Sequence, residues 1–399
     1  MLIAFVAAAP AGATNRVPVR AGYGHPHGAT TVHPHVVGTV SVTPSNIVFP
    51  AQRAGTFSGV GKTVTITNTG TVPVTFSDIE PTKNDFFGLT SCFDDSLPIG
   101  ESCTITNYFM PNAVGARSGT LEISDDAANS PQKVTMSGTG VEGYYVAGAG
   151  GEVAGFGDAV DEGDATNVGL TQPIISIKTT TNGDGYWLLG SDGGIFSYGN
   201  AHFYGSTGGI HLNQPVVGME RTVTGKGYWL VASDGGIFSY GDAKFYGSTG
   251  AIHLNQPVVG MARTPTGHGY WLVARDGGIF SFGDAKFYGS TGAIHLNQPI
   301  VGMVPRPNGK GYWLHAKDGG LFAFGDAPFY GGAAASGLSI SGMAATPDGG
   351  GYWMTSTTGA VFHYGNAASY GDLPSHGVAA SDVVGIAPTS PPLPIEFFN

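Results

Sequence analysis

The chain has 399 residues, and only 11% of them are charged, with 17 Lys and Arg against 28 Asp and Glu. The formal net charge of -11 and the lack of a long basic run disfavour a nucleic-acid-binding surface. The length allows two or three domains with sizeable cores. The 66 Gly and 25 Pro, beside an aromatic content of 11%, indicate a turn-rich globular chain and not a disordered one.

Residues 1–13, MLIAFVAAAPAGA, form a short apolar segment that ends in small residues. This pattern is typical of a secretory signal peptide, although a charged first region is missing. The alternative is an apolar tail or a start codon placed too late. No other segment approaches the roughly 20 apolar residues of a membrane span. We therefore expect an exported protein that is extracellular or at the cell surface.

Residues 14–38 are rich in Gly, Pro and His and lack periodicity, which indicates a linker. They contain two His-Pro-His triplets, formed by His25 and His27 and by His33 and His35. Histidines at this density take up transition metals. No acidic or thiol ligand completes a site, so adventitious binding is favoured over a designed metal site.

Residues 39–141 alternate apolar and polar side chains in runs of five to eight, separated by Asn, Gly and Pro turns. This pattern predicts an antiparallel β-sandwich. The only two cysteines, Cys92 and Cys103, both lie in this region. We expect them to form a disulfide, which would contribute about 2 to 3 kcal/mol by closing a short loop.

The same region carries a resemblance, in the segments VTITNTGTVPVTF, FMPNAVGARSGTLEI and VTMSGTG and in the spacing of the two cysteines. It resembles the immunoglobulin-like domains of the ASPM, SPD-2 and Hydin (ASH) type, which occur in exported bacterial proteins as the choice-of-anchor D module. The resemblance covers roughly 100 residues. It implies a structural or anchoring module and no catalytic residues.

Residues 142–389 contain six copies of one repeat, because a Gly-Tyr pair recurs at 143, 185, 227, 269, 311 and 351. Each copy has four strand-like runs, such as VVGMART, GYWLVA, GGIFSFG and KFYG, parted by turn residues. Four short strands in about 42 residues match one propeller blade. Helical repeats are excluded because Gly, aromatic and β-branched residues dominate.

The phase of the repeat predicts how the ring closes. The first copy lacks a VVGM-type strand, whereas residues 383–388, VVGIAP, supply one after the sixth copy. Pairing the two would remove two open sheet edges, so we expect an all-β chain in which a six-bladed β-propeller follows the immunoglobulin-like sandwich. Two β-trefoils are the alternative fold. Residues 390–399 form a Pro-rich tail whose role the sequence does not indicate.

The repeats also resemble the GYWLVA, DGGIFSFGDA and FYGS repeats of exported actinobacterial proteins, where such repeats accompany cell-wall hydrolases or stand alone. This resemblance covers about 250 residues. Most of these proteins are uncharacterised, so it implies an exported β-propeller-like protein and little about function.

Every tryptophan occupies the same repeat position, and Tyr145 stands there in the first copy. One interpretation is a ring of sugar-stacking platforms. We favour buried packing, because a strand in the middle of a blade is covered on both faces by neighbouring blades. The five residues are Trp187, Trp229, Trp271, Trp313 and Trp353.

Strand polarity places the turn after GYWLVA on the same face of the ring as the loop that crosses to the next blade. This face is the predicted ligand site, since amide, imidazole and carboxylate groups suit a polyhydroxylated ligand. A cell-wall or extracellular glycan fits it, and a surface protein fits nearly as well. The aspartates also have a simpler role as turn formers. The candidates are Asp192, Asp234, Asp276 and Asp318, His211, His253 and His295, and Asn213, Asn255 and Asn297.

The first copy departs from the repeat in an acidic cluster of Asp158, Asp161, Glu162 and Asp164. Clustered carboxylates bind calcium in many proteins. A charged edge strand that discourages sheet pairing explains the cluster more simply. Calcium is the only cofactor that the sequence suggests, and the cluster matches neither an EF-hand nor an RTX repeat.

Catalytic motifs are absent from the sequence: it has no G-x-S-x-G, no H-E-x-x-H, no P-loop and no sialidase box. We therefore expect a non-enzymatic binding protein with no catalytic residues. A polysaccharide or cell-wall hydrolase is the first alternative, and would require a carboxylate pair in one pocket. A passive surface scaffold is the second.

Overall fold

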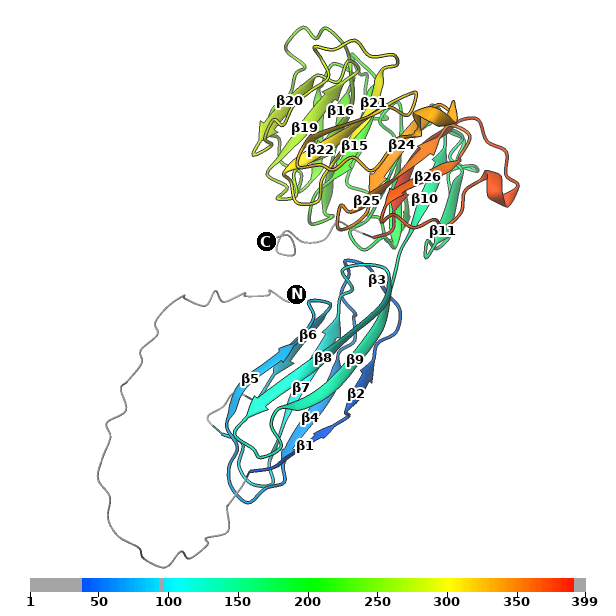
Figure 1. The fold of residues 1–399 in the computed structure, drawn as a ribbon. Coiled ribbons are helices and arrows are strands. Elements are labelled where there is room, and N and C mark those ends of the chain that lie inside the picture. The colour runs from blue at the N-terminus through cyan, green and yellow to red at the C-terminus, as the bar shows by residue number, and fades with distance from the viewer. Residues whose placement is uncertain (1–37, 93–95, 391–399) are drawn as a thin grey trace, which may run out of the picture. The chain divides into compact units, whose positions relative to one another are not determined.

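The structure is a computed structural model that describes residues 38–92 and 96–390, so the signal-like segment, the His-Pro-His triplets and the Pro-rich tail lie outside the described residues. Within these ranges the chain is all-β, with two short 3-10 helices, η1 (Ala333–Ser336) and η2 (Pro374–His376) (Figure 1). The strands form eight antiparallel or mixed sheets. The expected all-β class is therefore confirmed.

The first nine strands form two sheets. A four-stranded sheet has the order β1-β4-β7-β6, and a second sheet has the order β2-β9-β8-β5 with β3 beside β9. The strands are β1 (Val40–Thr43), β2 (Asn46–Val48), β3 (Gln52–Arg53), β4 (Lys62–Asn68), β5 (Phe76–Pro81), β6 (Phe86–Thr90), β7 (Ser102–Phe109), β8 (Gly115–Asp125) and β9 (Gln132–Val141).

Alternation along these strands builds a single core. In β7 every second residue is buried, and the buried set includes Cys103, Ile105 and Phe109. Phe109 stacks on Phe49 and Phe86 with ring centroids 5.5 and 5.2 Å apart. The expected disulfide is present between Cys92 and Cys103. The period-2 pattern thus carries one apolar face per sheet into a shared interior.

The repeats form six sheets of three strands each, with strand order first-second-third in every copy. The second and third strands of the first copy are β10 (Gly143–Gly148) and β11 (Val153–Gly157). The other sheets are β12 (Ile174–Thr179), β13 (Gly185–Gly190) and β14 (Ile195–Gly199); β15 (Val216–Arg221), β16 (Gly227–Ala232) and β17 (Ile237–Gly241); β18 (Val258–Arg263), β19 (Gly269–Ala274) and β20 (Ile279–Gly283); β21 (Ile300–Pro305), β22 (Gly311–Ala316) and β23 (Leu321–Gly325); and β24 (Ile340–Ala345), β25 (Gly351–Ser356) and β26 (Val361–Gly365).

The last strand, β27 (Val383–Pro388), pairs antiparallel with β10 and so takes the place of the missing first strand. β27 also contacts β24 of the preceding sheet and β12 of the following one. A buried cluster that includes Tyr144, Trp353 and Ile386 packs the sixth sheet against the first, and Figure 1 shows β24 to β26 beside β10 and β11. The phase of the repeat predicted this pairing.

The fourth run of each copy is not a strand, which corrects the expectation of four strands per repeat. In the segment from Lys244 to Gly247, side chains replace the backbone ladder. The Nε1 of Trp229 donates to the carbonyl of Lys244 at 2.7 Å, and the hydroxyl of Tyr270 in the next sheet donates to the carbonyl of Gly247 at 2.6 Å. The same hydroxyl accepts from the amide of Tyr246.

These bonds explain why each copy opens with Gly-Tyr-Trp. The Trp holds the fourth segment of its own copy, and the Tyr holds the fourth segment of the copy before it. Each of the five tryptophans is at most 1% exposed, so the packing interpretation is confirmed and the sugar-platform interpretation is wrong. Such aromatic pairs contribute about 0.5 to 1.5 kcal/mol beyond their buried area.

Candidate binding sites

The loop that crosses from one sheet to the next is attached to the turn between the second and third strands. We call the crossing loops, residues 205–214, 247–256 and 289–298, together with these turns, the crossing-loop face. In the middle copy, Thr249 donates from Oγ1 to the carbonyl of Asp234 at 2.9 Å. A Cβ on Gly235, which has a φ of 78°, would collide with that oxygen. Thr207 and Thr291 make the same bond in their copies.

The four predicted aspartates lie in these turns, and each has a structural bond. The Oδ1 of Asp234 accepts from the amide of Gly236 at 2.9 Å, and the other three make the equivalent bond. Asp192 also accepts from Thr171 through Oδ2. This is the geometry of an Asx turn, so one carboxylate oxygen of each aspartate stabilises its own turn.

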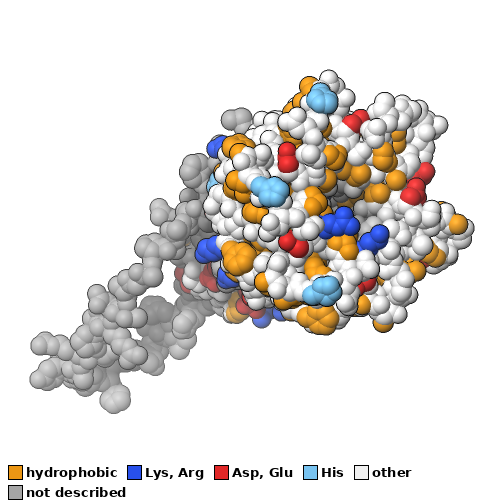
Figure 2. All heavy atoms as spheres, turned by 90° about the horizontal axis from the view of Figure 1, so that it is seen from above, with side chains coloured by type: hydrophobic (Ala, Val, Ile, Leu, Met, Phe, Trp, Pro, Cys, Tyr) orange, Lys and Arg blue, Asp and Glu red, His pale blue; other side chains and the backbone are white. Residues whose placement is uncertain are grey.

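The predicted histidines and asparagines lie at the tips of the three crossing loops, and all six side chains are exposed. Between them a leucine, such as Leu254, packs against the core and anchors the loop. The tips also present Ile210, Ile252 and Ile294, which are 56 to 59% exposed. Figure 2 shows histidine side chains set apart from one another over one face. The structure therefore presents these groups as separate copies and does not gather them into one pocket.

The acidic cluster of the first copy does not assemble a metal site within the described residues. Asp161 and Asp164 accept bonds from Gly163 and Thr166 in their own turns, and the Oδ1 of Asp158 accepts from Thr389 at 2.6 Å. Over residues 38–92 and 96–390, no three His, Cys, Asp or Glu side chains come together in a way that would hold a metal ion. The suggested calcium site has no counterpart there.

A second candidate site, which the sequence did not indicate, is a cavity of about 380 Å³ at the carboxyl ends of the first strands. Residues of β12, β15, β18, β21, β24 and β27 all line it. Because the crossing loops enter these strands at their amino ends, the cavity lies at the opposite end from the crossing-loop face. We call it the central pocket.

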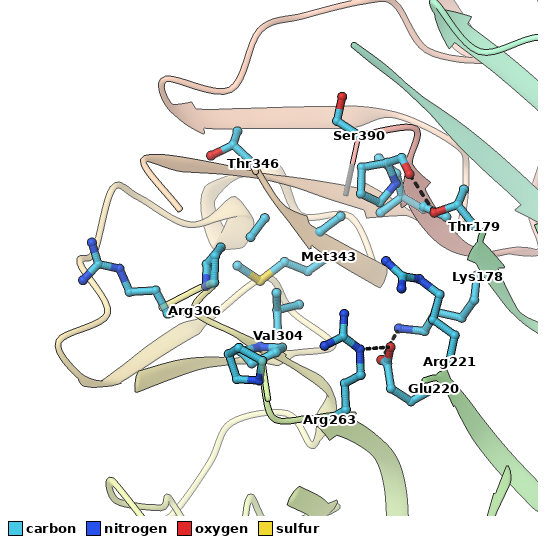
Figure 3. Close-up of a pocket in the computed structure, with 18 of the residues that line it drawn as sticks. Lys178, Thr179, Glu220, Arg221, Arg263, Val304, Arg306, Met343, Thr346 and Ser390 are labelled. Carbon is cyan, nitrogen blue, oxygen red and sulfur yellow. Dashed lines mark hydrogen bonds and ion pairs between the residues drawn. The ribbon is translucent and has the colours of Figure 1, made fainter. Parts of the chain in front are cut away.

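Charged and apolar residues occupy different sides of the central pocket. Lys178, Glu220, Arg221 and Arg263 come from the consecutive strands β12, β15 and β18. Equivalent positions of the other three strands carry only apolar residues, and Figure 3 shows two apolar side chains, Val304 and Met343, across from the charged group. The apolar residues at those positions are Val304, Pro305, Ala344, Ala345, Ala387 and Pro388.

Glu220 is the centre of the charged group. Its Oε2 lies 3.0 Å from the Nζ of Lys178, and its Oε1 lies 3.8 Å from the Nε of Arg263. Burial raises the pKa of Glu220, but the charges of Lys178 and Arg263 outweigh it and hold the pKa below its usual value. Arg221 is 8% exposed, and burial and repulsion from Arg263 lower its pKa to about 10.

The sequence contained a signal for this pocket. Residues 227–257 and 269–299 differ at two of 31 positions, whereas the pocket-side segments 220–226 and 262–268 differ at three of seven. Copies that are otherwise nearly identical thus diverge where they line the pocket. Periodicity analysis misses such residues because it looks for what the copies share.

No family model matches the sequence, and no curated protein matches it. Three solved structures show remote similarity. The ASH/PapD-like domain 7 of human CEP192 has 16% identity over 29% of this chain and 93% of its own, with a TM-score of 0.22. The β-propeller domain of Myceliophteria thermophila Cps50 (Swd1) has 10% identity over 50% and 69%, with a TM-score of 0.33. A protein of unknown function from Bacteroides thetaiotaomicron has 12% identity over 90% and 94%, with a TM-score of 0.44.

Other matches are partial, since the chain spans 50% of a protein of unknown function from Porphyromonas gingivalis W83, with 10% identity over 27% of this chain and a TM-score of 0.24. Among the described residues, there is no helix with the length and apolar character to cross a membrane.

Proposed function

We propose that the six three-stranded sheets form a closed six-bladed β-propeller, attached to an immunoglobulin-like module of the choice-of-anchor D type in an exported protein. Support for the ring comes from the pairing of β27 with β10 and from contacts between each first strand and the next. A chain that ends at Asp382 lacks β27 and leaves β10 unpaired on that side. It should unfold at a clearly lower temperature than a chain that ends at Ser390, and equal unfolding temperatures would contradict closure.

We further propose that the protein is non-enzymatic and binds a cell-wall or extracellular glycan through the crossing-loop face. The observation that carries this proposal is the threefold presentation of an exposed Ile-His-x-Asn tip on a base fixed by hydrogen bonds. A rigid base lowers the entropy that each loop loses on binding. A glycan with repeating units offers repeated partners to such tips.

The chemistry of the tips suits a sugar. The amide of Asn255 and the imidazole of His253 both donate and accept hydrogen bonds, as sugar hydroxyls do. The apolar face of a sugar ring would contact Ile252. Each tip alone would bind weakly, and three tips on one polymer would gain affinity through their linkage.

The test is retention of the described chain by insoluble cell-wall polysaccharide and peptidoglycan, with the supernatant assayed for released sugar. We expect retention without release. A variant with His211→Ala, His253→Ala and His295→Ala should lose about tenfold or more in retention, because it removes one donor from each tip. The matched control carries His268→Ala and His363→Ala, two exposed histidines outside the crossing loops, and should be retained like the unmodified protein.

Release of sugar would favour the hydrolase alternative. The central pocket has a single carboxylate in its described lining, Glu220, which is paired with Lys178 and Arg263. It thus offers no support for a catalytic carboxylate pair. Failure of retention on every glycan would contradict the proposal and leave a protein partner or a scaffold.

A further inference from the structure

The central pocket holds more positive charge than its own carboxylate balances. Lys178, Arg221 and Arg263 face the single carboxylate of Glu220. A fourth cation, Arg306, is paired with Asp326 at 2.8 Å, and Figure 3 shows it pointing away from the other pocket side chains. In a chain with a net charge of -11, two cationic groups here have no counter-ion among the described residues.

Arg221 is the clearest of these groups. The only hydrogen bond that its side chain makes within the described structure is from Nη1 to the carbonyl of Thr222 at 3.2 Å, and no described carboxylate lies within ion-pair distance. It is 92% buried, given its exposure of 8%. Figure 3 shows its guanidinium directed into the pocket beside that of Arg263. A buried cation without a partner is unfavourable in the empty protein, and an anion bound beside it removes that penalty.

The Nε of Arg263 is buried and has no hydrogen-bond partner, although Glu220 lies 3.8 Å away. Its Nη1 donates to the carbonyl of Thr264. Two guanidinium groups from adjacent strands therefore converge on one space with unused donors. Paired guanidinium donors match the geometry of a carboxylate or phosphate oxyanion.

The opposite side of the pocket determines what the rest of the ligand is like. Val304, Pro305, Met343 and Ala345 line it with apolar atoms, and the cavity of about 380 Å³ falls in the range of small-molecule sites. A free inorganic anion would leave this side unused. An organic molecule with one oxyanion and an apolar body would satisfy both sides.

We propose that the central pocket binds a small organic acid, with its carboxylate held between Arg221 and Arg263 and its apolar body against Val304 and Met343. This site is independent of the crossing-loop face and lies at the other end of the first strands. The carboxylate of the ligand takes the place of the missing counter-ion. Glu220 competes for the same cations and so limits the affinity.

The experiment is calorimetric titration of the protein with straight-chain carboxylates from acetate to octanoate, with 1-hexanol and inorganic phosphate as comparison probes. We expect binding that strengthens with chain length and is absent for 1-hexanol. Phosphate binding without carboxylate binding would overturn the proposal, because the apolar side would then play no part. Absence of binding by every probe at millimolar concentration would overturn it as well.

Variants separate a binding role from a structural one. Arg221→Met should weaken hexanoate binding about tenfold or more and, because it removes an unpaired buried charge, raise the unfolding temperature of the free protein. Glu220→Gln should tighten binding severalfold. Arg275→Met, an exposed arginine on the crossing-loop face, is the matched control and should change neither quantity. A lower unfolding temperature for Arg221→Met together with unchanged hexanoate binding would overturn the proposal.

The tail is the competing occupant, since residues 391–399 follow Ser390, which lines the pocket, and include the carboxylate of Glu396. The titration is therefore repeated on a chain that ends at Ser390. Equal affinity in the two chains supports a free ligand. Binding of hexanoate only by the shorter chain would assign the pocket to the tail and overturn the proposal.

Discussion

Glu142, between β9 and β10, should make the stability of the repeat sheets depend on pH. Its side chain is 5% exposed, and the hydroxyl of Tyr370 donates to its Oε1 at 3.0 Å. Burial raises its pKa from 4.5 to about 7, with smaller contributions from Asp348 and Asp158 and against the hydrogen bond from Tyr370. The folded protein thus keeps a proton that the unfolded chain releases.

The direction of the effect follows from proton linkage. Since the folded pKa lies above the unfolded one, the contribution of Glu142 to stability is complete below about pH 4.5 and is lost as the pH rises through about 7. One pH unit between the two pKa values corresponds to about 1.4 kcal/mol, so the full loss is about 3 kcal/mol. Glu142→Gln keeps an acceptor for Tyr370 and removes the ionisation.

The assay is urea unfolding at pH 5 and pH 8 followed by tryptophan fluorescence, which reports on the repeats alone because all five tryptophans lie there. Relative to the unmodified protein, Glu142→Gln should gain about 2 to 3 kcal/mol between pH 5 and pH 8. Glu101→Gln, at an exposed position, should show no such gain. Parallel pH profiles for the unmodified protein and Glu142→Gln would refute the reasoning.

Three further changes test the packing. Trp271→Ala should lower the free energy of unfolding by about 3 to 5 kcal/mol in urea, because it empties a buried site and frees the carbonyl of Lys286; a loss below 1 kcal/mol would count against a packing role. Thr249→Val should cost about 1 kcal/mol and speed hydrogen exchange in residues 247–256 while leaving exchange in 289–298 unchanged. Replacing Cys92 and Cys103 by Ser should cost the sandwich about 2 to 3 kcal/mol by circular dichroism without moving the tryptophan transition, and an unchanged sandwich would show that the bridge contributes nothing.

The period of the repeat was enough to predict the second and third strands of every copy and the pairing partner of β27. This worked because hydrophobic alternation and turn residues are local signals. The fourth segment failed for a non-local reason. Residues such as Lys286 to Gly289 have strand-like composition, but Trp271 of their own sheet and Tyr312 of the next occupy their backbone groups. Composition does not reveal which partner takes a backbone donor.

The predicted site was correct in placement and incomplete in role. Asp234 and the crossing loop do come together, as strand polarity indicated, but the bond that joins them is made by Thr249, which had not been singled out. The acidic cluster failed because Asp158, Asp161 and Asp164 each have a local partner. Clustering in sequence does not make carboxylates converge when each one closes its own turn.

The two candidate sites lie at opposite ends of the same first strands, and the repeat treats those ends differently. At the amino ends, the crossing loops are nearly identical, so the crossing-loop face presents one chemistry three times and gains by repetition. At the carboxyl ends, Lys178, Glu220 and Arg263 occupy a place where other copies carry Val304 or Pro305, so the central pocket has one charged side and one apolar side. Repetition suits a polymer, whereas asymmetry can orient a single small molecule. A ring of repeats that kept its outer loops and varied its inner strand ends would therefore bind both kinds of ligand without either site constraining the other.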